Sequence, residues 1–186
     1  ESNVTGFLNI LEAAKTHGIK RVVYASSSSV YGDSIGLPKI ESSIGQPLSP
    51  YAVSKYSDEL YANVFHSAYD MELIGLRYFN VFGPRQNPEG EYAAVIPLFM
   101  KSLLSKQSPY INGDGEQTRD FTFVENAVQA NIKGLFTTNS AAFGEAYLAD
   151  ISKAKDLIGY QPLFNIDSGL KITLKWFKDN KEILGL

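Results

Sequence analysis

The stretch that decides the fold is Arg21–Ser26, with the sequence Arg-Val-Val-Tyr-Ala-Ser. This β-branched and aromatic run predicts a buried parallel strand. Before it, residues 3–17 carry apolar side chains at helical spacing and are followed by Gly18, which predicts an amphipathic helix and its end. After it, Ser49-Pro50 begins a helix pattern that runs to about residue 69, and residues 73–79 repeat the strand pattern. This order of elements predicts a doubly wound α/β sheet.

The rest of the chain continues the mixture of helices and strands. Residues 33–50 are rich in Ser, Gly and Pro, and residues 80–92 contain two glycines and two prolines, so both stretches predict loops. We expect helices over residues 94–106, 125–136 and 166–184. We expect short strands over residues 110–115, where the strand ends in a turn, and over residues 121–124.

Composition excludes several classes of protein. The chain has 186 residues, 44% of them hydrophobic and 20% charged, which is typical of a globular protein. The net charge is −3 and no basic block occurs, so we expect no nucleic-acid partner. The chain has no cysteine, and its two histidines lack partners at metal-ligand spacing, so we expect no metal site. It has no apolar run long enough to span a bilayer and no secretory segment, which favours the cytoplasm and no membrane partner.

Two residues four apart, Tyr51 and Lys55, suggest the chemistry. They face the same side of a helix, and a strand ending in the hydroxyls of Ser26–Ser29 precedes them. A free phenol has a pKa of about 10, and an ammonium close by lowers such a pKa. Alone, a Tyr-x-x-x-Lys pair is most often a surface helix pair. Together with the serines it predicts a metal-free proton-transfer set for redox chemistry at a sugar carbon.

Four segments carry a resemblance to a known family. Residues 24–33, 49–55, 76–84 and 112–121 resemble the extended short-chain dehydrogenase/reductases, and are most similar to the UDP-sugar 4-epimerases that act on UDP-N-acetylglucosamine. The resemblance implies a Rossmann-type fold, NAD as cofactor, a UDP-sugar substrate and a role in nucleotide-sugar and polysaccharide metabolism. It also implies a homodimer through the helices at residues 3–17 and 51–69. Residues 1–80, with 121–136 returning to them, would form the dinucleotide-binding domain, and residues 81–186 mainly a smaller sugar-nucleotide lobe.

The resemblance also implies roles for individual residues. Tyr51 would be the catalytic base and Lys55 its partner at the cofactor ribose, with Ser27 as the catalytic hydroxyl. Ser28 and Ser29 would line the sugar pocket, and Tyr78 would lie beside the nicotinamide. The nucleotide would be bound by Asn80 at the diphosphate, the backbone of Val95 and Ile96 at the uridine, Tyr110 and Asn112 at the uracil, and Arg119 at a phosphate.

The reaction follows from what the serine segment lacks. Related dehydratases carry acids after the catalytic hydroxyl, whereas no carboxylate occurs between Ser26 and Val30. This favours reversible oxidation and reduction at C4, converting UDP-N-acetylglucosamine to UDP-N-acetylgalactosamine through a 4-keto intermediate. UDP-glucose and UDP-glucuronate remain alternative substrates, and a non-catalytic nucleotide-sugar-binding relative remains an alternative class.

The chain departs from the family pattern in two places. The Gly-x-x-Gly-x-x-Gly loop, which lets the backbone approach the cofactor pyrophosphate, is absent, and the chain begins directly in a helix. We therefore expect that an N-terminal part of the fold is missing from this sequence. We also expect a second gap near Tyr147 and Leu148, where two segments that the family keeps apart follow each other directly.

Overall fold

The computed structural model describes residues 2–89, 93–138 and 150–184. The chain divides into two compact units. The first comprises residues 1–79 and 128–161, and the second comprises residues 80–127 and 162–186. The expected gap near Tyr147 and Leu148 lies outside the described residues.

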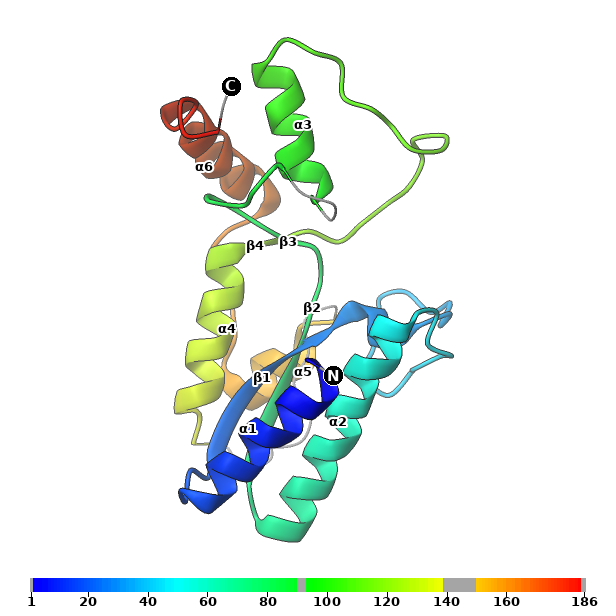
Figure 1. The fold of residues 1–186 in the computed structure, drawn as a ribbon, viewed down its shortest axis with the longest axis vertical. Coiled ribbons are helices and arrows are strands. Elements are labelled where there is room, and N and C mark those ends of the chain that lie inside the picture. Colours follow the sequence, from blue (N-terminus) through cyan, green and yellow to red (C-terminus); the bar gives the residue numbers. More distant parts are fainter. Residues whose placement is uncertain (1, 90–92, 139–149, 185–186) are drawn as a thin grey trace. The chain divides into compact units, whose positions relative to one another are not determined.

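A parallel pair of strands forms the centre of the first unit (Figure 1). Strand β1 (Arg21–Ser27) pairs with β2 (Glu72–Tyr78), and helix α2 (Pro50–Tyr69) connects them. The prediction that Ser49 caps the start of α2 is confirmed, because its side chain accepts a hydrogen bond of 3.1 Å from the backbone N–H of Ala52. The two strands end in register, with Ser27 opposite Tyr78. Polar side chains at both strand ends therefore lie at the same edge of the sheet.

Helices cover both faces of this strand pair (Figure 1). Helices α1 (Val4–Thr16) and α2 pack on one face, in a cluster that contains Leu73. Helices α4 (Val124–Phe136) and α5 (Ser152–Ile158) pack on the other face, in a cluster that contains Ile74 and Leu76. Neighbouring residues of β2 thus enter opposite cores, as the alternation along a strand requires. The predicted doubly wound α/β fold with parallel strands is confirmed.

After β1 the chain turns sharply. A short 3-10 helix, η1 (Ser28–Tyr31), follows the strand directly, and Gly32 then takes a φ of 55°. A Cβ at Gly32 would overlap the backbone oxygen of Gln46. Glycine is therefore required where the loop 33–49 folds back beside the end of β1.

The second unit is built around a small aromatic core. Strands β3 (Val81–Phe82) and β4 (Thr122–Phe123) pair in parallel. Helix α6 (Ile166–Asp179) packs against β4, and helix α3 (Val95–Leu104) packs against α6. The ring centroid of Phe123 lies 5.6 Å from that of Phe82 and 5.1 Å from that of Phe164. Gly169 of α6 lies against the Phe123 ring, where any side chain would clash.

Three local predictions were wrong. Residues 110–115 form no strand, because Tyr110 and Ile111 are exposed and pair with no other strand of the described residues. Val81–Phe82 is a strand rather than loop, and the last long helix ends at Asp179 rather than near residue 184. No helix in the described part of the chain combines the length and the apolar character needed to cross a bilayer.

Candidate active site

The serine segment forms a compact hydroxyl cluster at the end of β1. Ser27 caps η1, and its Oγ accepts hydrogen bonds from the backbone N–H of Ser29 at 3.2 Å and from the Ser29 hydroxyl at 3.0 Å. Ser27, Ser28 and Ser29 are all half-buried. The hydroxyl of Ser27 can still donate its own proton, so it remains able to bind a substrate oxygen.

Tyr51 and Lys55 lie on the first two turns of α2. The Tyr51 side chain is 50% exposed, whereas the Lys55 side chain is only 16% exposed. The Lys55 ammonium donates to the backbone oxygen of Ala25 at 2.9 Å and to Asp58 at 3.2 Å. The bond to Ala25, two residues before Ser27, places the start of α2 beside the end of β1. The hydroxyl cluster and the Tyr-Lys pair therefore belong to one neighbourhood of the first unit.

Tyr78 is held at the end of β2. Its hydroxyl accepts a hydrogen bond of 2.5 Å from the Asn131 side-chain amide of α4. Burial raises the pKa of Tyr78 above its ordinary value, so its phenol stays protonated at neutral pH. Tyr78 is therefore suited to forming a wall of the site and not to acting as a base.

A buried charged network lies beneath this edge of the sheet. The Arg77 guanidinium donates to both oxygens of the Glu59 carboxylate, at 2.9 and 2.7 Å, and the Ser26 hydroxyl donates to the same carboxylate at 2.5 Å. Arg77 also donates to the Glu41 backbone oxygen at 3.2 Å and lies 4.7 Å from the centre of the Tyr31 ring. These contacts tie α2, β1, β2 and η1 together directly behind the serines.

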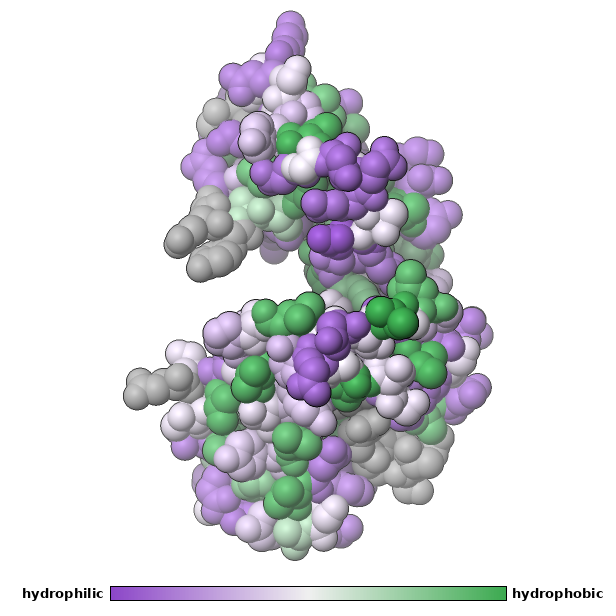
Figure 2. Space-filling model, turned by 90° about the vertical axis from the view of Figure 1, so that its right-hand side faces the viewer, coloured by the Kyte–Doolittle hydropathy of each residue, from purple (hydrophilic) through white to green (hydrophobic). Residues whose placement is uncertain are grey.

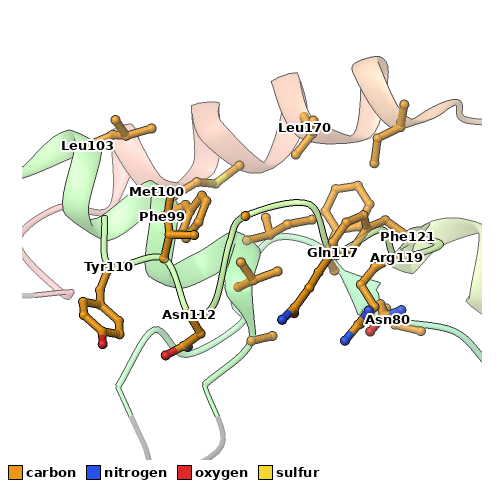
Figure 3. A pocket seen from close by; sticks show the side chains of 18 residues that line it. Asn80, Phe99, Met100, Leu103, Tyr110, Asn112, Gln117, Arg119, Phe121 and Leu170 are labelled. Atoms are coloured by element: carbon orange, nitrogen blue, oxygen red, sulfur yellow. The ribbon is translucent and has the colours of Figure 1, made fainter. Parts of the chain in front are cut away.

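The second unit contains a cavity of about 830 Å³. Its apolar wall comes from α3 and α6, through Phe99, Met100, Leu103 and Leu170 (Figure 3). Six residues predicted from the motifs lie together around this cavity, although they are spread over forty positions of the sequence. They are Asn80, Val95, Ile96, Tyr110, Asn112 and Arg119.

Polar groups in this cavity suit a nucleotide. Asn80 is fixed by donating to the Asp120 backbone oxygen at 2.8 Å, and the exposed Arg119 guanidinium donates to the backbone oxygen of Thr118 at 2.8 Å. Helix α3 begins at Val95 without a side-chain cap, so its first N–H groups are available to an acceptor. Tyr110 is 83% exposed, which leaves its ring free for stacking.

Sequence reasoning missed several residues that the structure places at these sites. Gln117 and Phe121 line the cavity together with its apolar wall. Asp58 and Asn131 contact Lys55 and Tyr78. The burial of Asp58 could have been predicted from the sequence, because Asp58 lies four residues before Ala62 and so falls on the buried face of α2.

The residues present fit one end of a dinucleotide cofactor. An ammonium has three N–H donors, and Lys55 uses two of them, which leaves one for a ribose hydroxyl next to the half-exposed Tyr51. No glycine-rich phosphate loop occurs in the 186 residues, so the fit concerns the ribose and nicotinamide end alone. Within the described ranges, no three acidic or histidine side chains gather as a metal site would require.

Comparison with known proteins gives several similar enzymes. The UDP-glucose 4-epimerase of Mycolicibacterium smegmatis is 30% identical over 218 aligned positions, which cover 97% of this chain and 69% of that protein. The UDP-glucuronate 4-epimerase of Thermodesulfobacterium geofontis is 31% identical over 221 positions, covering 99% of this chain and 67% of that protein. Both alignments exceed 186 positions, so each relative has residues within the aligned range that this chain lacks.

A solved structure is similar over the same range. The UDP-N-acetylglucosamine 4-epimerase from Methanobrevibacter ruminantium M1, in complex with UDP-N-acetylmuramic acid, is 35% identical with a TM-score of 0.89. The match covers 96% of this chain and 69% of that one. The family model described as the NAD dependent epimerase/dehydratase family matches residues 1–148. The hydroxyl cluster, the Tyr-Lys pair and these matches agree, and the chain belongs to the NAD dependent epimerase/dehydratase family.

Proposed function

We propose that this chain epimerises UDP-N-acetylglucosamine at C4 to give UDP-N-acetylgalactosamine. The enzyme class, an NAD-dependent UDP-sugar 4-epimerase, rests on the family match and on the 4-epimerases among its relatives. The observation that carries the choice of reaction is the carboxylate-free hydroxyl cluster of Ser27–Ser29, with the Tyr51–Lys55 pair beside it. The N-acetylated sugar is favoured by the Methanobrevibacter enzyme, which is similar at 35% identity.

The residues of the first unit would move the proton. NAD, when bound, would supply the redox chemistry, taking a hydride from C4 and returning it to the opposite face of the 4-keto carbon. Tyr51 takes the proton of the C4 hydroxyl and later gives it back, while Ser27 holds the sugar oxygen by its hydroxyl. Lys55 supplies a positive charge near the phenolate and a donor for the ribose. Ser28 and Ser29 line the sugar side, and Tyr78 closes the wall next to the nicotinamide.

The cavity of the second unit would bind the nucleotide. The first N–H groups of α3, at Val95 and Ile96, donate to the uridine, while Tyr110 and Asn112 flank the uracil. Asn80 and Arg119 face the diphosphate, where a guanidinium gives strong charge-assisted hydrogen bonds. A cavity of about 830 Å³ with a largely apolar wall and a few polar groups is within the size of ordinary ligand sites.

Two copies of the chain would associate through α1 and α2. These helices expose apolar side chains to solvent, and Figure 2 shows hydrophobic residues on the surface of the unit that carries α2. Apolar side chains that are gathered on the surface of these helices favour association with a protein partner at this surface. The residues concerned are Ile10, Val53, Leu60 and Val64.

Substrate conversion by the complete enzyme tests the proposal. The enzyme is incubated separately with UDP-N-acetylglucosamine, UDP-glucose and UDP-glucuronate, and each sugar is separated from its 4-epimer by capillary electrophoresis. We expect fastest conversion of the N-acetylated sugar. Faster conversion of UDP-glucose or UDP-glucuronate would identify that sugar nucleotide as the substrate instead. No conversion of any of the three would indicate that the protein is a non-catalytic relative.

A variant tests the assignment of the base. Tyr51→Phe should lower kcat by a factor of about 10²–10⁴, which is the usual contribution of a positioned general base, and should leave NAD binding in place. Tyr61→Phe is the matched control, because Tyr61 is a partly exposed tyrosine of the same helix. Full turnover by Tyr51→Phe would refute the role of Tyr51.

A further inference from the structure

Two adjacent carboxylates of α2, Asp58 and Glu59, are buried beside the proton-transfer set. The Asp58 side chain is 1% exposed, and Glu59 is buried to a similar degree. Isolated carboxylates are costly to bury, so each needs partners that offset the loss of water. The two residues differ sharply in the partners that they have.

Glu59 is fully engaged, and Asp58 is not. Both oxygens of Glu59 accept hydrogen bonds from Arg77, and one also accepts from Ser26. Asp58 places Oδ2 3.2 Å from the Lys55 ammonium, while its buried Oδ1 has no hydrogen-bond partner within the described ranges. Burial raises the pKa of Asp58 above its ordinary value in spite of the neighbouring ammonium. Asp58 is therefore a poor stabiliser of the fold.

Asp58 does, however, fix the position of the Lys55 side chain. The ammonium is fixed between two acceptors on different elements, the Ala25 backbone oxygen of β1 and the Asp58 carboxylate of α2. A lysine side chain is otherwise flexible, with four rotatable bonds and considerable rotamer entropy. Two contacts hold it in one place and leave its third N–H for a ligand.

We propose that Asp58 is a positioning residue that, together with the Ala25 carbonyl, holds the Lys55 ammonium at the end of β1 ready to bind a cofactor ribose hydroxyl. This inference rests on the proposed role of Lys55 in the epimerase. Asp58 itself contacts neither substrate nor cofactor, so it acts through Lys55. Removing it should free the lysine at little cost in stability, because the buried Oδ1 atom that has no partner within the described ranges is removed as well.

NAD titration of the complete, cofactor-free enzyme tests the inference. Asp58→Ala should weaken NAD binding roughly tenfold, the usual scale for losing a charge-assisted hydrogen bond, and lower kcat with little change in KM for the sugar nucleotide. Asp58→Asn keeps an oxygen acceptor in the same place and should recover most of the affinity. The matched control is Asp179→Ala on α6, which removes the carboxylate of an exposed Lys175–Asp179 pair and should change nothing.

A double-variant cycle separates positioning from a general structural role. In the Lys55→Met background, Asp58→Ala should have no further effect on NAD affinity, because its target is gone. Unchanged affinity in Asp58→Ala with native Lys55 would overturn the inference. So would a lowered thermal midpoint with equal loss of affinity in both backgrounds, since that pattern belongs to a structural residue.

Acylation of Lys55 gives a readout that needs no cofactor. With acetic anhydride as the reagent and mass spectrometry of the Lys55 peptide as the measurement, Asp58→Ala should raise the labelling rate several-fold, because the freed amine is more accessible. An unchanged rate would overturn the inference even if the wild-type enzyme binds no NAD. Faster labelling in Asp58→Ala, combined with wild-type protein that binds no NAD, would instead count against the proposed function alone.

Discussion

Removal of the Arg77 guanidinium should be the most damaging single change in the first unit. In Arg77→Met, the Glu59 carboxylate stays buried and loses both guanidinium hydrogen bonds, while it keeps the one from the Ser26 hydroxyl. Breaking a buried ion pair by deleting one partner costs about 3–5 kcal/mol, and the lost contact with the Tyr31 ring adds roughly 0.5–2 kcal/mol. A domain has about 5–15 kcal/mol of stability in total, so this variant should be near the limit of folding.

Urea unfolding of the complete protein, followed by far-UV circular dichroism, measures the effect. The double variant Arg77→Met with Glu59→Leu removes both charges of this pair, so it should be more stable than Arg77→Met alone by about 2 kcal/mol or more. Lys20→Met, which breaks the exposed Lys20–Asp70 pair, is the control and should have little effect. If the changes in the free energy of unfolding of the two single variants simply add in the double variant, the reasoning fails. Additivity would mean that Arg77 does not stabilise the buried Glu59 carboxylate.

Two further variants test the loop and the core. Gly32→Ala should destabilise the protein by roughly 1–3 kcal/mol, because Gly32 has a φ of 55° and a Cβ would overlap the Gln46 backbone. Thermal unfolding measures this change. The control is Gly36→Ala, where a Cβ has no atom within 4 Å, and it should be as stable as wild type. Burial raises the pKa of Tyr160 above its ordinary value of about 10. The stability that the buried neutral phenol contributes is therefore complete below that pH and is lost as pH rises through the folded pKa. Tyr160→Phe should therefore flatten the fall in stability above about pH 10 in urea titrations, and an unchanged slope would contradict this.

Local sequence signals were enough for the elements that position the chemistry. Ser49 and Pro50 predicted the start of α2, and Gly18, with a φ of 70°, follows the end of α1 as expected. The strand before Ser27 was predicted because a run of β-branched residues between a helix and a polar segment has few alternatives. These signals lie within a few residues of the feature that they determine.

The failures concern features that depend on distant residues. Tyr110 and Ile111 have the composition of a strand, but without a partner strand they contribute to a cavity wall instead. The two-residue strands at Val81 and Thr122 exist only because they meet each other. In the same way the cavity wall from Leu103 and Leu170 brings together two helices far apart in sequence. The motifs supplied the polar residues of the cavity, whereas its apolar wall required the fold.

The distribution of buried polar groups connects the fold to the chemistry. The buried polar or charged side chains of the described residues are Ser26, Asp58, Glu59, Arg77, Asn126 and Thr173. The first four lie where β1, β2 and α2 meet: Ser26 precedes Ser27, Asp58 and Glu59 follow Lys55 by three and four residues, and Arg77 lies opposite Ser26. An apolar core there would be at least as stable, since buried ion pairs seldom exceed well-packed hydrophobic groups in stability. Directional contacts hold two elements in one register, and the proposed proton-transfer site, divided between the end of β1 and the start of α2, would require a fixed register.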